Sequence, residues 1–191
     1  MRVSRIQAAE NRETVINVAS RLFRERGFDG IGLKDLMEAA GLTQGGFYKQ
    51  FASKEDLVAQ ASRRALESAT LRWSAATAEN PEDPLGAVIA FYLSADHREE
   101  KMDGCPVVAL GADAARQGSD VKASFEAGIK AYLELLERLI AEPDGEGPNG
   151  KAMVILSTMV GALTLSRVVN DPGLAQAFLD RAVEHLRETA A

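Results

Sequence analysis

Apolar residues recur at helical spacing along most of the chain, whereas runs of β-branched residues are scarce. Over residues 6–26, the spacing i, i+3, i+4, i+7, i+8 of one buried helical face is occupied by Val15, Val18, Ala19, Leu22 and Phe23. Gly27 follows directly and can supply the left-handed residue that ends a helix. The pattern therefore predicts a long first helix that stops at this glycine.

Two shorter segments follow at the same spacing. Residues 33–40 repeat the apolar pattern over two turns before Gly41, a second C-terminal stop. Thr43 is then placed to cap a further short helix, in which Phe47 and Phe51 share one face. The opposite face is predicted to carry polar residues, namely Gln44, Tyr48 and Lys49.

The rest of the chain is predicted to be helical as well. Ser53 and Asp56 fit a capping signature that opens a helix reaching about residue 77. Further helices are expected over residues 85–97, 106–116, 120–141, 151–169 and 172–189. The sequence thus predicts an all-α fold of about nine helices, divided into a three-helix head at 1–54 and a helical body at 55–191.

Composition narrows the possible chemistry. One cysteine cannot form an intrachain disulfide, and two histidines far apart in sequence do not suggest a metal site. No nucleophile with a base, paired carboxylates or phosphate loop is evident, so we expect neither an enzyme nor a cofactor. The polar, basic N-terminus lacks a signal peptide, and the apolar segment 152–166 is shorter than a membrane span, which predicts a cytoplasmic protein with no membrane association.

Charge is distributed unevenly along the chain. The whole sequence carries a formal charge of -6, but residues 1–54 hold nine Lys and Arg against six Asp and Glu. The first quarter is therefore positive by three, and the remainder is strongly acidic. A nucleic-acid partner is expected at the N-terminal end.

Residues 33–57 combine two short helices with a glycine-containing turn, which is typical of a helix-turn-helix that places its second helix in the major groove. This region resembles the TetR family of bacterial transcriptional regulators. The resemblance rests on Gly27-Phe28, Ala40-Gly41-Leu42-Thr43, Phe47-Tyr48-x-x-Phe51 and Ser53-Lys54-Glu55-x-Leu57, and it covers about the first 60 residues. Beyond them, the body matches the family in length and helix order only.

Side-chain chemistry suggests roles in binding double-stranded DNA. The Gln44 amide suits an adenine edge, and Lys49 suits either guanine acceptors or a phosphate. Tyr48 and Lys54 resemble the family's phosphate contacts, and Lys34 is a second backbone candidate. Gly45 and Gly46 are poor helix formers whose compensation would be closer approach to DNA. The complete predicted DNA-binding set is Lys34, Gln44, Gly45, Gly46, Tyr48, Lys49, Gln50 and Lys54.

Three positions depart from the family pattern. Ile31 and Gly32 stand where a Thr/Ser pair usually caps the second helix, so that cap is expected to be missing. Gln50 occupies a place often held by histidine. These differences bear on which operator bases are read more than on DNA binding itself.

The resemblance also implies a homodimeric, ligand-responsive repressor whose body encloses an apolar cavity, with activation as the other possibility. The last two helices are predicted to dimerise as a four-helix bundle, unless they only close the monomer core. Candidate effector-binding residues for an unidentified small molecule are Trp73, Phe91, Tyr92, Met102, Cys105, Phe125, Ile129 and Tyr132. Candidate dimerisation residues are Leu156, Val160, Gly161, Thr164, Phe178, Ala182 and Leu186.

Two alternatives remain open for regulation. Cys105 precedes Pro106, which suits the first position of a helix, where free N–H groups favour a reactive thiolate. That placement is compatible with a thiol-based sensor of oxidants or electrophiles, although a lone cysteine is more often an inert apolar residue. The other alternative is a helix-turn-helix interaction protein without an effector, which would have a filled body.

Overall fold

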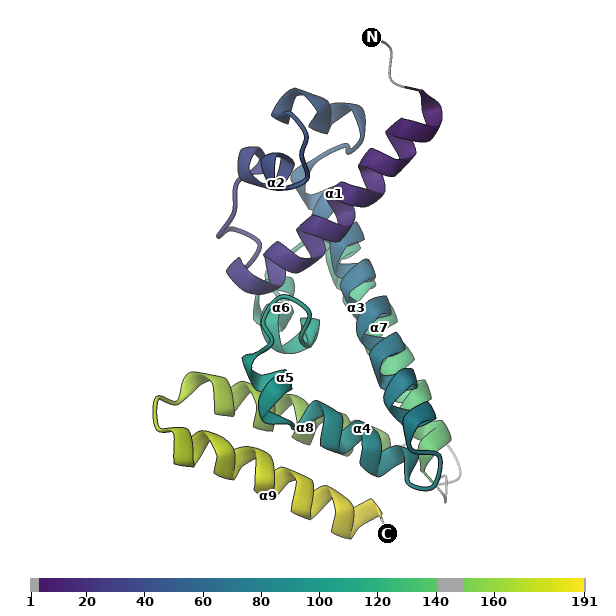
Figure 1. The fold of residues 1–191 in the computed structure, drawn as a ribbon, viewed down its shortest axis with the longest axis vertical. Coiled ribbons are helices and arrows are strands. Elements are labelled where there is room, and N and C mark those ends of the chain that lie inside the picture. The colour runs from purple at the N-terminus through teal and green to yellow at the C-terminus, as the bar shows by residue number, and fades with distance from the viewer. Residues whose placement is uncertain (1–3, 141–149, 191) are drawn as a thin grey trace. The chain divides into compact units, whose positions relative to one another are not determined.

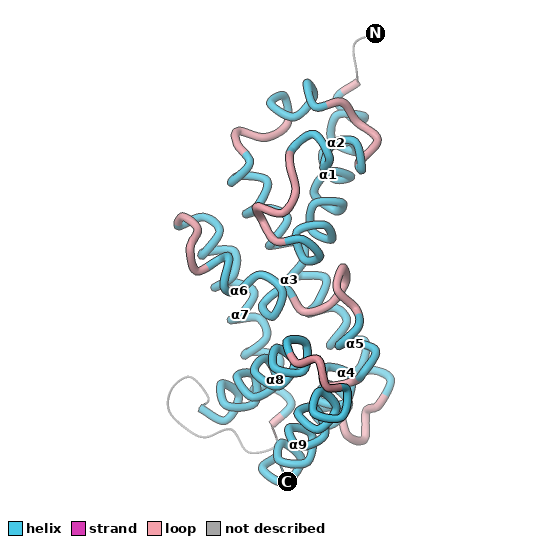
Figure 2. The backbone as a smooth tube through the Cα atoms, turned by 90° about the vertical axis from the view of Figure 1, so that its left-hand side faces the viewer, coloured by secondary structure: helices cyan, strands magenta, loops and turns pink. Residues whose placement is uncertain are grey.

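A computed structural model describes residues 4–140 and 150–190, and this part of the chain is helical with connecting loops (Figures 1 and 2). The helices of the N-terminal half are α1 (Arg5–Arg26), α2 (Leu33–Ala39), the 3-10 helix η1 (Gln44–Lys49), α3 (Lys54–Glu79) and α4 (Pro84–Tyr92). They are followed by α5 (Ala95–Glu99), α6 (Pro106–Ala114), α7 (Ser119–Leu139), α8 (Gly150–Val168) and α9 (Pro172–Ala190). The all-α prediction is confirmed, and within the described ranges nine α-helices and one 3-10 helix stand against the nine helices expected.

The predicted helix over residues 85–97 is wrong in one respect, because it is broken into α4 and α5. Leu93 ends α4, and Ser94 begins a new helix with its hydroxyl accepting the backbone N–H of His97 at 3.1 Å. A serine at an N-cap competes with helix continuation by satisfying a free N–H group of the next helix. Apolar spacing alone does not reveal this competition.

The chain divides into two compact units. Unit 1 contains Met1–Ser68 and Lys101–Ala127, and unit 2 contains Ala69–Glu100 and Gly128–Ala191. Helices α3 and α7 contribute residues to both units. This division differs from the predicted boundary after residue 54, because α6 and the first part of α7 group with the N-terminal helices.

Unit 1 is built on the buried face of α1. Val15, Ile16, Ala19 and Phe23 are buried, and the Phe23 ring meets Phe28 edge-on at 5.5 Å. Together these apolar side chains form the core that supports α2 and η1.

The end of α1 is joined to the loop before α6. Gly27 ends the helix with φ 77° and donates its N–H to the Phe23 carbonyl at 2.8 Å. The buried Arg24 donates to the Ser20 carbonyl at 2.9 Å and to the Gly104 carbonyl at 3.0 Å, and it pairs with Asp103 at 3.5 Å. These bonds satisfy a guanidinium that would otherwise be costly to bury.

Unit 2 is organised around α8 and α9, which pack against each other, with α4 against α9 and α5 against α8. Figure 1 shows α8 and α9 as neighbouring, antiparallel helices. Arg167 of α8 donates to the carbonyls of His97, Arg98 and Glu100 at 2.7, 2.9 and 2.8 Å. A cation at the C-terminal end of α5 satisfies carbonyls that lack helical partners.

Helix α8 is long and apolar enough, by length and composition alone, to span a membrane. It nevertheless buries Ile155, Met159 and Leu163 within unit 2, where it packs on α9. We therefore describe α8 as a core helix of this unit.

Candidate nucleic-acid interface

The turn between α2 and η1 is fixed by backbone geometry. Gly41 has φ 71° and donates its N–H to the Glu38 carbonyl at 2.9 Å, and Leu42 donates to the Met37 carbonyl at 2.8 Å. This pair of bonds is a Schellman motif, in which the left-handed residue reverses the chain after the helix. The predicted stop at Gly41 is confirmed, and the sharp turn brings η1 back against α2.

The segment after the turn is not the α-helix that the spacing predicts. It forms the 3-10 helix η1, and although Thr43 occupies the N-cap position, its side chain makes no capping hydrogen bond. Gly45 and Gly46 account for this outcome, since glycine gains little from α-helical propensity. A 3-10 turn is tighter and typically short.

Aromatic packing holds η1 in place. Phe47 and Phe51 are buried, as predicted, and their rings stack at 5.3 Å with an interplanar angle of 27°. Met37 of α2 is also fully buried in unit 1. The apolar side of η1 is therefore anchored to the head, which leaves its other side toward solvent.

The polar side of η1 is exposed. Gln44 and Lys49 are exposed, and 72% of the Tyr48 surface is accessible. The Tyr48 ring also meets Phe47 edge-on at 5.1 Å, which restricts the position of its hydroxyl. The Gln44 amide, the Tyr48 phenol and the Lys49 ammonium are thus displayed together on the exposed side of η1, whose opposite side is buried.

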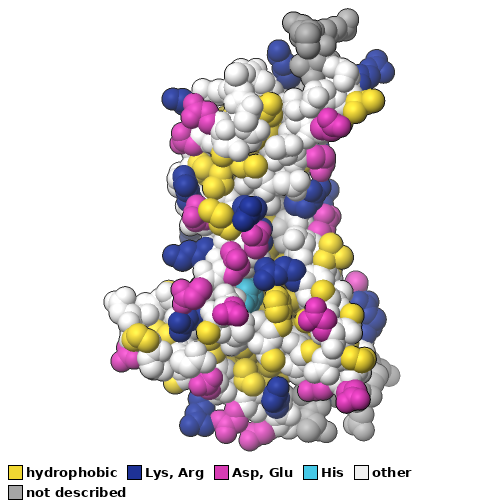
Figure 3. Space-filling model, in the orientation of Figure 1, with side chains coloured by type: hydrophobic (Ala, Val, Ile, Leu, Met, Phe, Trp, Pro, Cys, Tyr) yellow, Lys and Arg dark blue, Asp and Glu magenta, His cyan; other side chains and the backbone are white. Residues whose placement is uncertain are grey.

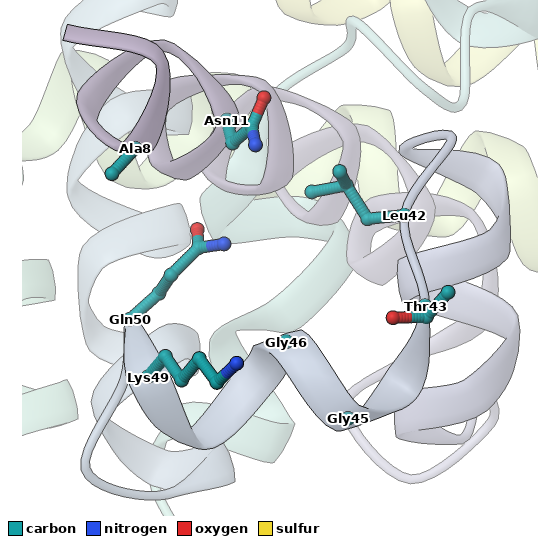
Figure 4. Close-up of a pocket in the computed structure, with 8 residues that line it drawn as sticks. All are labelled: Ala8, Asn11, Leu42, Thr43, Gly45, Gly46, Lys49 and Gln50. Atoms are coloured by element: carbon teal, nitrogen blue, oxygen red, sulfur yellow. The ribbon is translucent and has the colours of Figure 1, made fainter. Parts of the chain in front are cut away.

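A groove of about 470 Å³ lies between the start of α1 and η1 (Figure 4). In Figure 4, Gln50 extends from the end of η1 toward α1, and Gly45 and Gly46 leave the η1 backbone uncovered. Four of the lining residues were missed by sequence reasoning: Ala8, Asn11, Leu42 and Thr43. These residues come from the start of α1 and from the turn before η1, and helical periodicity carries no signal that the two segments line one groove.

The two predicted lysines outside η1 have different surroundings. Lys34 is exposed on α2 and lies 3.8 Å from Glu38. Lys54 is half-buried, and its ammonium donates to the Ile31 carbonyl at 3.1 Å. An ammonium has three donors, so this bond leaves capacity for a phosphate.

The departure at residues 31 and 32 has a structural explanation. Gly32 is the N-cap of α2 and makes no side-chain capping bond, as predicted, while Ile31 is buried in unit 1. The apolar side chain at residue 31 adds to the core, and Lys54 fixes the backbone just before α2.

The start of α3 is capped on both sides, as the sequence indicates. The Asp56 N–H donates to the Ser53 hydroxyl at 3.1 Å, and the Asp56 carboxylate accepts the Ala52 N–H at 3.0 Å. The pKa of Glu55 is lowered by a hydrogen bond from its own backbone N–H and by one from Ser53. These bonds fix the direction in which the chain leaves η1.

Basic residues do not form one continuous patch on the face shown in Figure 3, where Lys and Arg are interspersed with Asp and Glu. On this face, any attraction for an anion would come from local groups and not from a broad basic field. Binding of DNA would therefore depend on individual contacts by the residues of η1.

The predicted effector residues fall in both units. Trp73, Tyr92 and Tyr132 of unit 2 are buried together, with the Trp73 ring stacked on Tyr132 at 4.5 Å and edge-on to Tyr92 at 5.5 Å. Phe91 and Ile129 of the same unit are half-buried. Unit 1 holds the remaining three residues, which are Met102, Cys105 and Phe125.

The predicted dimerisation residues differ in their accessibility. Leu156, Ala182 and Leu186 are buried within their own chain, whereas the remaining four are half-buried: Val160, Gly161, Thr164 and Phe178. Apolar residues with a larger exposed surface on the same helices were missed, namely Met153, Val154, Leu165, Val168 and Leu174. Helix α8 is apolar on nearly all sides, so its periodicity could not distinguish its inner from its outer face.

An anchored helical segment that follows a Schellman turn and displays polar side chains defines a helix-turn-helix DNA-binding domain. Residues 15–61 match the family model described as bacterial regulatory proteins, tetR family. The N-terminal part of the chain thus matches the DNA-binding domain of the TetR family of transcriptional regulators.

Relatives extend the likeness beyond the head. The repressor NemR of Escherichia coli is 24% identical over 134 residues, which are 69% of this chain and 67% of NemR. The repressor KstR2 of Mycolicibacterium smegmatis is 28% identical over 145 residues, or 71% and 68% of the two chains. The crystal structure of a TetR transcriptional regulator from Chloroflexus aurantiacus has a TM-score of 0.78 at 27% identity and covers 95% of this chain and 94% of that one.

Proposed function

We infer that the chain is a cytoplasmic repressor that binds a palindromic operator as a homodimer and is released by a small apolar or amphipathic effector. The observation that carries DNA binding is the display of Gln44, Tyr48 and Lys49 on an element whose opposite side is buried. Repression is favoured because NemR and KstR2 are described as repressors.

Operator binding is tested by selecting duplexes with the purified protein from a random-sequence pool. We expect enrichment of an inverted repeat whose half-sites are one helical turn apart or a multiple of it. Recovery of no enriched duplex, or of a single half-site bound by one chain, would contradict the proposal. A Gln44→Ala variant should relax the base preference in one position of each half-site.

Dimerisation is supported by one face of α8. Val154, Gly161, Leu165 and Val168 lie at i, i+7, i+11 and i+14, and the three apolar side chains are 59%, 44% and 69% exposed. A Cβ atom at Gly161 would meet nothing within 4 Å in its own chain. The stripe is therefore apolar and offers room for close approach of a second copy.

Sedimentation of a Gly161→Glu variant tests this face. The substitution leaves the monomer fold intact because its side chain points into open space, but it places a charge between two apolar helices. We expect a monomer where the parent is a dimer. Leu71→Glu is the matched control, because Leu71 is an exposed apolar residue of α3 and its replacement should leave the dimer unchanged.

Effector binding is supported by the aromatic cluster of Trp73, Tyr92 and Tyr132, since ligand pockets are lined predominantly by hydrophobic and aromatic side chains. Trp73 is the single tryptophan of the sequence, so its fluorescence reports on this cluster alone. Titration with a panel of apolar and amphipathic compounds should identify one that changes Trp73 emission and releases the selected duplex. A compound that changes neither signal is not an effector, and a panel without one favours a protein that has no effector.

A second candidate is regulation through Cys105. This residue is the N-cap of α6, immediately before Pro106, and its side chain makes no capping bond. Its thiol is nevertheless buried, which limits access by an oxidant. Oxidant-induced release of the selected duplex by the parent, and its loss in Cys105→Ser, would favour this candidate over an apolar effector.

A further inference from the structure

The end of η1 is held by a residue of α1 that has no expected contact with DNA. Arg12 donates from Nη2 to the Gln60 side-chain carbonyl at 2.5 Å and from Nε to the Gln50 backbone carbonyl at 3.4 Å. Its guanidinium also lies over the Phe51 ring, 5.2 Å from the centroid. The half-buried Arg12 thus contacts Gln60 of α3 and the two residues that follow η1, Gln50 and Phe51.

A chain of hydrogen bonds continues from Arg12 to the start of α3. Gln60 donates to the Asp56 carboxylate at 2.6 Å, and Asp56 accepts the Ala52 N–H at 3.0 Å. The Gln60 amide therefore has a fixed orientation, with its oxygen toward Arg12 and its nitrogen toward Asp56. Residues 50–53 are held from both ends by this network.

The network matters because η1 has little stability of its own. It is six residues long, contains two adjacent glycines and has no side-chain cap at Thr43. A short 3-10 segment of this kind depends on tertiary contacts to keep one conformation. Phe47 anchors its middle, and the Arg12 network is the polar anchor at its end.

We propose that Arg12, acting through Gln60 and Asp56, is a positioning residue that orders the recognition segment η1 before DNA is bound. The inference rests on the proposed binding of an operator by η1. A preordered segment loses less conformational entropy on binding, so the network raises operator affinity without a contact to the duplex. The effect of this network on operator affinity should not depend on a positive charge at residue 12.

Arg12→Lys and Gln60→Leu test the proposal in binding to the selected operator duplex. Lysine keeps the charge but cannot form the planar fork or the same stack on Phe51, and Gln60→Leu removes no charge at all. Each variant should weaken operator binding by about tenfold, as expected for loss of a charge-assisted hydrogen bond. Because one network is broken in both, the double variant should be little weaker than either single one.

Arg64→Lys is the matched control. Arg64 also joins α3 to α1, through Glu13 at 2.6 Å and Asn17, but it touches no residue of 44–53. Its replacement should leave operator affinity within twofold of the parent. Equal losses in Arg64→Lys and Arg12→Lys would show that general packing of α1 on α3 is responsible, and would overturn the specific role of Arg12.

Salt dependence separates positioning from a direct phosphate contact. Loss of one phosphate contact lowers the slope of log affinity against log salt concentration by about 0.9. Gln60→Leu and Arg12→Gln should both keep the parental slope. A slope reduced by about one in Arg12→Gln alone would assign Arg12 to the duplex and overturn the proposal.

Amide hydrogen exchange of the free protein provides a test that does not depend on DNA. Arg12→Lys should accelerate exchange in residues 47–53 and leave residues 13–26 of α1 unchanged. Unaltered exchange in residues 47–53 refutes the positioning role even if the parent selects no duplex. Failure of DNA binding and failure of the network are therefore distinguishable.

Discussion

Alanine at Gly45 or Gly46 should stabilise the protein and weaken its binding to DNA. A Cβ atom at Gly45 would meet nothing within 4 Å, and one at Gly46 would lie 3.8 Å from the Met37 Cε atom, an ordinary contact. Neither glycine has a positive φ angle. The fold therefore does not require glycine at these two positions.

The size of the stabilisation follows from the unfolded chain. Replacing glycine by alanine where the native backbone tolerates it contributes about 0.4–1 kcal/mol, because the unfolded state has fewer conformations. For a domain of this size, about 1 kcal/mol corresponds to a rise of roughly 2–4 °C in Tm. Operator affinity should fall by at least about tenfold, equal to about 1.4 kcal/mol, because the methyl group fills space through which DNA approaches the η1 backbone.

Thermal unfolding and titration of the selected duplex measure the two effects. Gly111→Ala in α6 is the control, since its Cβ atom would lie 3.7 Å from the Val107 Cγ1 atom and far along the chain from η1. It should raise Tm and leave DNA affinity unchanged. Parental affinity in both Gly45→Ala and Gly46→Ala would refute close approach of DNA, and a lower Tm would refute the account of the local backbone.

Three further variants test other parts of the structure. Lys54→Gln should lower the slope of log operator affinity against log salt concentration by about 0.9, because one phosphate contact is lost. Tyr48→Phe should weaken binding without changing that slope, because a phenol is neutral. If the slope is the same in both variants and the parent, Lys54 only holds the Ile31 carbonyl and does not contact DNA. Gly41→Ala should destabilise the protein by about 1 kcal/mol or more in denaturant titrations, because its φ of 71° is costly for alanine; parental stability would contradict this strain. Burial, together with the nearby charges of Arg167 and Arg72, lowers the pKa of His97 from its ordinary 6.5 to about 4, against the opposing effect of the hydrogen bond between its ring and the Tyr92 carbonyl. The folded state thus resists protonation: its stability is full above pH 6.5 and declines as the pH falls from 6.5 to 4, by about 1 kcal/mol at pH 5.5, and His97→Gln should abolish that decline.

Local signals were sufficient for most of the fold. Gly27 and Gly41 both adopt the positive φ expected of helix stops, and Ser53 caps α3 as its spacing from Asp56 indicates. The first helix begins at Arg5, one residue before the predicted start. Each of these features depends on residues within a few positions of one another, which is why the sequence reveals them.

The parts that were not predicted depend on distant residues. Arg12 contacts Gln50 and Gln60, which are 38 and 48 positions away. The position of η1 likewise depends on packing of Phe47 and Phe51 into a core that no local window contains. The inner and outer faces of α8 are distinguished by its contacts with α9 and α5.

The bond from Lys54 to the Ile31 carbonyl constrains how this sequence can drift. In this chain the start of α2 has no capping side chain at Gly32, and its peptide is held instead by a cation 23 positions away. Replacement of that lysine would loosen the start of α2 and would also remove the charge that we propose contacts a DNA phosphate. A serine or threonine acquired at residue 32 would cap α2 and so spare the helix when the lysine is lost. The loss of the positive charge would remain.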